Sequence, residues 1–278
     1  MEKKQFINCS GKLIDISEPI VMGILNVTPD SFYDGGKNNT LVNALKKTEK
    51  IIEEGGKIVD IGAFSTRPNS QIITHEQERN RLFPILEVVK KEFPNQIISI
   101  DTFRAKIAKE AVLSFGVDII NDISSGMFDN QMFDVVTDLN VPYIMMHLQG
   151  NLDTMHNSYF YLNIVHDIIL FFSEKINLLR IRGVNDIILD PGFGFSKNLI
   201  QNYELLKNLK QFDIFEELLL VGISRKSMIY KALDIESKGA LNGTTVLNTL
   251  ALQAGANILR VHDVKEAVET IELLKYLK

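Results

Sequence analysis

The sequence predicts an α/β fold, a (β/α)8 (TIM) barrel over about residues 19–278, with a short N-terminal β-hairpin over about residues 5–16 that closes the barrel floor. Eight short apolar runs are hydrophobic almost throughout, which is typical of parallel strands buried on both faces. A segment with helical periodicity follows each run, and eight strand–helix repeats in ~250 residues indicate a closed barrel. A doubly wound open sheet is the alternative, but it usually has fewer strands.

The expected strands are short, apolar and rich in β-branched residues. They are Pro19–Val27, Lys57–Ser65, Gln96–Thr102, Val117–Ile123, Val141–Leu148, Asp186–Pro191, Leu218–Ser224 and Asn257–Val261.

The expected helices lie between these runs, and several end at glycine, which readily adopts the left-handed conformation of a helix C-terminus. Thr40 can cap the first helix, and Gly116 and Gly183 follow two others. The helices are expected at Leu41–Glu54, Thr74–Lys91, Arg104–Phe115, Phe128–Leu139, Leu162–Arg182, Gln201–Leu209, Thr244–Ala254 and Val264–Leu277. Before the barrel, Gln5–Ile16 forms the expected hairpin, with Gly11 at its turn.

Length and charge limit the organisation and the partners of the chain. It has 278 residues, 45% of them hydrophobic, which is enough for one large core. No Pro/Ser-rich linker interrupts the alternation of strands and helices, so we expect a single domain over residues 1–278. The net charge of −5 provides no basic field that would favour nucleic acid or an anionic membrane, so anionic substrates need local Lys and Arg.

Three features indicate a soluble cytoplasmic protein. The single cysteine, Cys9, excludes an internal disulfide and suits a reducing compartment. Met1–Lys12 is polar and lacks the apolar core of a signal peptide. The apolar run Ile168–Phe172 is far shorter than the ~20 residues that a membrane-spanning helix needs.

Polar residues gather where each expected strand ends. A single Asp after a strand is more often a helix cap than a site residue, but capping alone does not explain eight such ends. In a barrel these ends share one face, which carries the active site. The residues are Asn26, Asp60, Asp101-Thr102, Asn121-Asp122, His147, Asp190, Ser224-Arg225-Lys226-Ser227, and Arg260 with His262 and Asp263.

Several common chemistries are absent from the sequence. It has no P-loop, no dinucleotide-binding G-x-G-x-x-G and no HExxH motif, and one cysteine cannot form a zinc cluster. His75, His156 and His166 lack metal-ligand spacing and are interpreted as ordinary surface or core histidines.

The segment Gly23–Gly36 is the most informative one, because a buried strand breaks into a polar loop that carries an amide, a hydroxyl, two carboxylates and an aromatic ring. It resembles the first signature of the dihydropteroate synthase family of pterin-binding enzymes. Further segments resemble signatures of that family in the same order along nearly the whole chain. They are DIGAFSTRP (Asp60–Pro68), SIDTF (Ser99–Phe103), INDISSG (Ile120–Gly126), MHLQG (Met146–Gly150), LDPGFGF (Leu189–Phe195), GISRKS (Gly222–Ser227) and RVHDV (Arg260–Val264).

The resemblance implies that an enzyme condenses (7,8-dihydropterin-6-yl)methyl diphosphate with 4-aminobenzoate, giving 7,8-dihydropteroate and diphosphate. The residue types suit a pterin: the Asp190 carboxylate can accept from two ring N–H groups, and the Asn121 amide can donate and accept. The implied pterin-binding residues are Asp101, Asn121, Met146, Asp190, Phe195 and Lys226.

The same resemblance assigns the remaining subsites. Diphosphate is expected at Asn26, Thr66, Arg67, Arg260 and His262, with Mg²⁺ as cofactor and the Asn26 oxygen as its protein ligand. Asp34, Lys226, Arg260 and His262 are the expected catalytic residues, and 4-aminobenzoate is expected at Phe32, Thr66, Pro68 and Ser227. The family also suggests a homodimer and a target of sulfonamides.

The chain departs from the family pattern in its second loop. Ala63-Phe64 stands where Gly-Glu is common, and Asn69 replaces a common Gly. We therefore expect an altered aminobenzoate subsite with unchanged pterin chemistry.

Two alternatives to a synthase remain. One is a methyltetrahydrofolate-binding methyltransferase domain, which needs no diphosphate machinery, and the other is a non-catalytic pterin-binding barrel. Asn26, Lys226, Arg260 and His262 are all present and favour the synthase.

Overall fold

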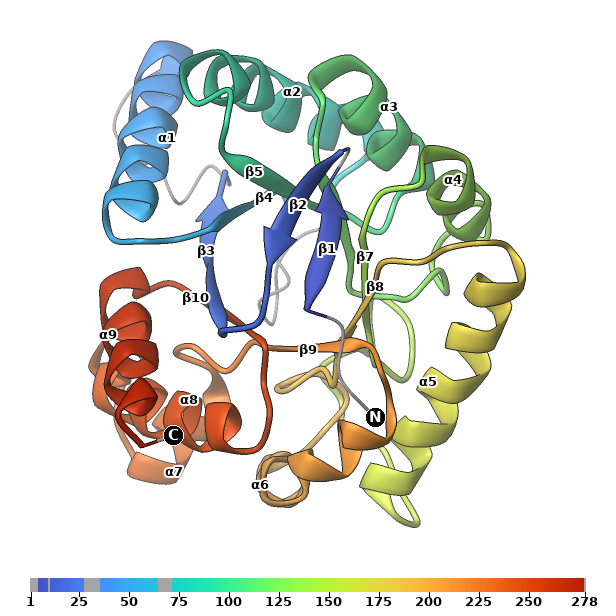
Figure 1. The fold of residues 1–278 in the computed structure, drawn as a ribbon, viewed down its shortest axis with the longest axis vertical. Helices are drawn as coiled ribbons and strands as arrows, with labels where there is room; N and C mark the ends of the chain where they lie inside the picture. Colours follow the sequence, from blue (N-terminus) through green and yellow to red (C-terminus); the bar gives the residue numbers. More distant parts are fainter. Residues whose placement is uncertain (1–4, 10, 28–35, 65–71, 278) are drawn as a thin grey trace.

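The computed structural model describes residues 5–9, 11–27, 36–64 and 72–277. Eight parallel strands form a closed barrel, in which each strand pairs with the next and the last pairs with the first (Figure 1). The strands are β3 (Ile20–Asn26), β4 (Ile58–Gly62), β5 (Ile97–Asp101), β6 (Ile119–Asp122), β7 (Tyr143–Met146), β8 (Ile187–Asp190), β9 (Leu218–Val221) and β10 (Ile258–Val261). The pairing of β10 with β3 confirms the barrel and excludes the open sheet.

Helices cover the outside of the barrel (Figure 1). They are α1 (Gly36–Glu53), α2 (His75–Glu92), α3 (Ala105–Phe115), α4 (Met132–Leu139), α5 (Ile164–Ile181), α6 (Leu199–Lys207), α7 (Ser227–Leu233), α8 (Leu241–Gln253) and α9 (Val264–Lys275), with 3-10 turns at Leu209–Ile214 and Ser237–Gly239. Capping boxes begin α2 and α6, and Gly116 ends α3 in the left-handed conformation.

One helix differs from expectation. Between β9 and β10 the periodicity predicts a single helix, Thr244–Ala254, whereas the structure has two, α7 and α8. Helix α7 has only seven residues and buries only Met228 and Ile229, so it has no periodic apolar face for a sequence pattern to detect. Its first residue, Ser227, follows directly on the functional segment after β9.

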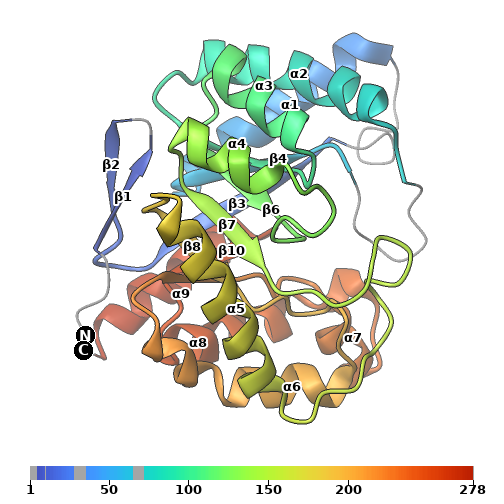
Figure 2. The same ribbon diagram turned by 90° about the vertical axis from the view of Figure 1, so that its right-hand side faces the viewer.

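The hairpin of β1 (Phe6–Cys9) and β2 (Lys12–Asp15) closes the barrel floor, as predicted. Figure 2 shows it at one end of the barrel, and the β7 arrow points away from it. Ile7 and Cys9 pack in a cluster with the first inward-facing residue of the barrel strands, such as Ile58 and Ile97. This apolar plug seals the amino-terminal end, so the carboxyl-terminal end is left for chemistry.

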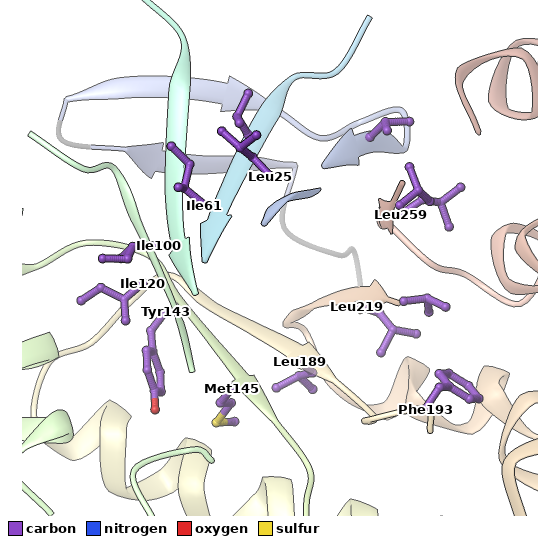
Figure 3. Close-up of a cluster of buried hydrophobic side chains, with 14 of the residues drawn as sticks. Leu25, Ile61, Ile100, Ile120, Tyr143, Met145, Leu189, Phe193, Leu219 and Leu259 are labelled. Atoms are coloured by element: carbon purple, nitrogen blue, oxygen red, sulfur yellow. The ribbon is translucent and has the colours of Figure 1, made fainter. Parts of the chain in front are cut away.

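Strand residues alternate between the two sides of the barrel wall. Outward-facing side chains such as Leu25, Ile61 and Leu189 form the large core between strands and helices (Figure 3). The inward-facing residues change in character along each strand. Ile58 and Ile97 lie in the apolar floor, and two or four residues later Asp60 and Asp101 replace them.

Within the part of the chain that the structure describes, none of the helices has the length and apolar character needed to span a membrane.

Candidate active site

A cavity of about 1080 Å³ lies at the carboxyl ends of the strands. Seven predicted site residues line it: Asn26, Asp101, Phe195, Lys226, Ser227, Arg260 and His262. Three others, Asn121, Met146 and Asp190, are buried where β6, β7 and β8 end. The predicted residues Phe32, Asp34, Thr66, Arg67 and Pro68 lie outside the described residues.

Gly222, just after β9, marks the point where the charged side chains converge. A Cβ atom on Gly222 would lie 3.7 Å from Lys226 Nζ, 3.9 Å from Arg260 Cβ and 4.0 Å from Asp190 Oδ2. The three side chains thus surround one small volume, and the missing side chain of Gly222 keeps that volume open.

Arg260 is held between two carboxylates on the barrel axis side of the strands. Its Nε donates to Asp60 Oδ2 at 2.7 Å, and an η nitrogen donates to Asp101 Oδ2 at 2.7 Å. Asn121 Nδ2 donates to the same Asp60 oxygen at 3.0 Å. Four strands, β4, β5, β6 and β10, therefore share one network, and Asp60 orients both Arg260 and Asn121.

Burial is the largest influence on the pKa values of the carboxyl groups Asp101 and Asp190. It raises the pKa of Asp101 to about 7, although the charge of Arg260 opposes the shift. Burial also raises the pKa of Asp190, and Lys226 opposes it. For Arg260, burial alone would lower the pKa, but the Asp60 and Asp101 carboxylates outweigh burial and raise it. The Arg260 guanidinium therefore stays charged, whereas Asp101 can take up a proton near neutral pH.

Lys226 reaches the centre of the site from the segment before α7. Its ammonium donates to the Phe193 carbonyl at 2.6 Å and lies 4.8 Å from the centre of the Phe195 ring. Burial lowers the pKa of Lys226 to about 8, although Asp190 opposes the shift. A planar heterocycle near Phe195 would meet a cationic donor in Lys226 and a carboxylate acceptor in Asp190.

Two functional candidates were missed by reasoning from the sequence alone. Asp60 is noted there only as a strand-end residue, yet its side chain is fully buried and orients two predicted site residues. The sequence does contain a signal for this role. Asp60 lies two residues after the inward-facing Ile58, so its side chain points to the same side of the barrel wall. His156, interpreted as an ordinary histidine, lines the cavity and stacks on Phe195 with ring centres 5.5 Å apart.

Two strand-end residues point away from the cavity. Asp122 accepts from the Tyr143 hydroxyl at 2.7 Å and from Ser124, in the layer between strands and helices. His147 packs edge-on against Phe171 of α5. Asp122 follows the inward-facing Asn121, and His147 follows the inward-facing Met146. Because neighbouring strand residues point to opposite sides, Asp122 and His147 face outward and support the loops instead of lining the site.

Among the described residues, no group of three or more His, Cys, Asp and Glu side chains is arranged to hold a metal ion. Asn26 does line the cavity, on the same wall as Arg260 and His262. Mg²⁺ usually takes one or two protein ligands and fills its shell with water and substrate phosphates. One amide oxygen therefore fits an ion that binds together with a diphosphate, and not a resident metal in a protein cage.

Comparisons with known proteins agree with this geometry. A family model described as "Pterin binding enzyme" matches residues 22–262, from β3 to the residue after β10. The chain is 40% identical over 267 residues to dihydropteroate synthase of Escherichia coli K12, which covers 95% of this chain and 94% of that protein. The chain belongs to the dihydropteroate synthase family.

Solved structures of dihydropteroate synthases have the same fold. The Yersinia pestis enzyme in a sulfonamide drug complex superposes with a TM-score of 0.91 at 38% identity, covering 98% of each chain. The Xanthomonas albilineans enzyme with 4-aminobenzoic acid has a TM-score of 0.91 at 32% identity, covering 99% of this chain and 98% of that one. The protein is accordingly a transferase, and its barrel is that of the dihydropteroate synthases.

Proposed function

We propose that this protein acts as dihydropteroate synthase on the residues described above, joining the pterin-methyl group of (7,8-dihydropterin-6-yl)methyl diphosphate to the amine of 4-aminobenzoate. The observation that carries the proposal is the convergence of Asp190, Lys226 and Arg260 around Gly222. These groups place one carboxylate acceptor and two cationic donors around one small volume. The 4-aminobenzoic acid named for the Xanthomonas structure supports the second substrate.

The pterin subsite is assigned to the deep end of the cavity. Asp190 accepts two ring N–H groups, and Asn121, oriented by Asp60, matches the remaining edge. Lys226 donates to the ring carbonyl or a ring nitrogen, and Met146 and Phe195 pack against the ring faces. Asp101, bound to Arg260, presents the second carboxylate. Because these polar groups are buried, a ligand that leaves them unpaired binds much more weakly.

The diphosphate subsite is assigned to Asn26, Arg260 and His262, which line the same cavity. Thr66 and Arg67 complete this subsite in the proposal, as in the family resemblance. When bound with the diphosphate, Mg²⁺ neutralises its charge, and Asn26 is its proposed protein ligand.

The reaction needs little acid–base chemistry from the protein. The bond between the methylene carbon and the diphosphate oxygen breaks, the electron pair leaves with diphosphate, and the pterin ring stabilises the methylene cation. Arg260, His262 and Lys226 favour this charge separation electrostatically. The amine lone pair of 4-aminobenzoate then forms the new C–N bond, and a proton passes to solvent. Ser227, with Phe32, Thr66 and Pro68, is assigned to the aminobenzoate, and Asp34 to the cation.

A direct assay tests the proposal. Purified protein with Mg²⁺, the pterin diphosphate and 4-aminobenzoate should release diphosphate, and release should stop when the aminobenzoate is omitted. Release that does not need aminobenzoate, or no release at all, would contradict the synthase assignment and favour a pterin-binding barrel of another kind.

Pterin binding should weaken in base. The proposed donor is the charged form of Lys226, whose pKa is about 8, so affinity for the pterin diphosphate should fall by about tenfold per pH unit above that pH. Titration calorimetry without aminobenzoate measures this dependence. Lys226→Met should bind weakly at every pH, and its affinity should not fall further above about pH 8. If the affinity of Lys226→Met still falls there, another group causes the loss of binding in base.

Of the altered second loop the structure describes Ala63 and Phe64, and of these two Phe64 is the one that lines the cavity. It is buried, lines the cavity and meets Phe103 edge-on at 5.6 Å. We propose that it reshapes the aminobenzoate subsite. Phe64→Leu should raise the KM for aminobenzoate several-fold and leave the KM for the pterin diphosphate unchanged. Phe128→Leu is the matched control, because Phe128 meets Phe103 at the same 5.6 Å without lining the cavity. Equal effects of the two variants would refute the assignment.

The organisation of the protein is also part of the proposal. We infer a single domain, because the hairpin residues Ile7 and Cys9 are buried in the barrel floor. A homodimer is supported by exposed apolar residues on α8, Val246 and Leu250, and sedimentation would test it. A cytoplasmic location is consistent with the buried free thiol of Cys9.

A further inference from the structure

The loop between β8 and α6 forms one wall of the site and has an unusual backbone. Gly192 and Gly194 have φ of +73° and +80°, and Ser196 has φ of +50°. These left-handed residues turn successive carbonyls in different directions, so that the Phe193 carbonyl accepts from Lys226 on the cavity side. The same loop holds Asp190, because Gly192 N–H donates to Asp190 Oδ1 at 2.8 Å.

Lys197, at the end of this loop, contacts two other carbonyls of the loop. Its Nζ donates to the Gly192 carbonyl at 3.0 Å and to the Phe195 carbonyl at 3.1 Å, and it lies 3.1 Å from His147 Nδ1. Burial and the charge of Lys197 lower the pKa of His147 well below its usual value, so a neutral imidazole can accept. The three N–H groups of an ammonium are thus matched by three acceptors.

The charges around Asp190 come from several elements. Lys226 precedes α7, Arg260 lies on β10, and Lys197 precedes α6; all three favour the ionised carboxylate. Around Lys197 itself, Asp190 is the opposing charge, Lys226 the like charge, and His147 on the β7 side is neutral. Burial lowers the pKa of Lys197 to about 7, so Lys197 is charged at acidic pH.

We propose that Lys197 is a positioning residue of the pterin site, which fixes the Gly192 and Phe195 carbonyls and helps to keep the Asp190 carboxylate ionised. Lys197 also borders the cavity, but in this proposal it acts through Asp190 and the loop and not through a contact with the pterin. The inference rests on the proposed assignment of Asp190 to the pterin.

The test is the pH dependence of pterin diphosphate binding, measured by calorimetry with Mg²⁺ on the full chain. In Lys197→Met, Asp190 loses a neighbouring cation, so it takes up a proton at higher pH. As the pH is lowered, the variant should therefore lose binding at a higher pH than the wild type does, by up to about one pH unit. This loss of affinity at low pH is the acid limb of the binding curve. If Lys197→Met does not fold, Lys197→Gln keeps donors for the loop carbonyls, removes the charge and should show the same shift.

Lys175→Met is the matched control. Lys175, which is less deeply buried than Lys197, also donates to a loop carbonyl, that of Ser125 at 2.8 Å, but on the loop after β6. It should lose stability without shifting the acid limb. An unshifted limb in both Lys197 variants would overturn the inference while leaving the synthase assignment intact. Wild-type protein that binds no pterin diphosphate at any pH would instead refute the assignment of Asp190.

Discussion

Replacing Arg260 with Met should destabilise the protein and nearly abolish activity. The substitution leaves Asp60, which is fully buried, and Asp101 without the cation that lies between them. Breaking a buried pair in this way costs about 3–5 kcal/mol of unfolding free energy. Diphosphate release should fall by at least about 10², the effect of removing one electrostatic stabiliser of the leaving group.

The loss of unfolding free energy in Arg260→Met should grow as the pH rises. The pKa of Asp101 is already raised to about 7, and loss of the Arg260 charge raises it further, so the folded variant binds more protons than the unfolded chain. The unfavourable contribution of Asp101 is then absent at low pH and grows as the pH rises toward its folded-state pKa. Urea unfolding should show a larger difference between Arg260→Met and wild type at about pH 8 than at about pH 5.

Arg79→Met provides the comparison for Arg260→Met. Arg79 also binds a carboxylate, that of Glu110, but both side chains are substantially exposed. An exposed pair is worth about 0–1 kcal/mol, so this variant should lose little stability and show little pH dependence. Adding Asp60→Asn to Arg260→Met should recover part of the stability and none of the activity. A loss in Arg260→Met as small as that in Arg79→Met would contradict the network described here.

Gly192→Ala is the second substitution with a large expected effect. A Cβ atom at Gly192 would lie 2.0 Å from the His147 carbonyl oxygen. Both residues lie within two positions of the end of a barrel strand, so neither backbone can move far. The φ of +73° adds strain. We expect a loss above about 4 kcal/mol, which thermal unfolding and soluble yield would reveal.

Gly183→Ala separates the clash from the backbone strain. Gly183 has a φ of +86°, but nothing lies within 4 Å of the position of its Cβ. This variant should lose only about 1–2 kcal/mol, the penalty for a left-handed non-glycine residue. If the two alanine variants are equally stable, the close approach between β7 and the loop after β8 does not constrain the protein.

The sequence predicted the strands and the face that carries the site well, because both depend on local patterns. Near-continuous apolar runs occur where strands are covered on both sides, and Ile58, Ile97 and Ile119 in the floor are such residues. The polar residues that end the strands, among them Asp101 and Asp190, follow within the same runs. The barrel and its C-terminal site therefore followed from the sequence.

The partners of each side chain were decided only by the tertiary structure. Asp60 and Arg260 are 200 residues apart in the sequence, and only barrel closure between β10 and β3 brings them within hydrogen-bonding distance. Adjacent residues such as Asn121 and Asp122 face opposite sides of the wall, because side chains alternate along a strand. A pattern locates a polar residue at a strand end; the register of the closed barrel determines which of these residues meet, and so which of them form the site.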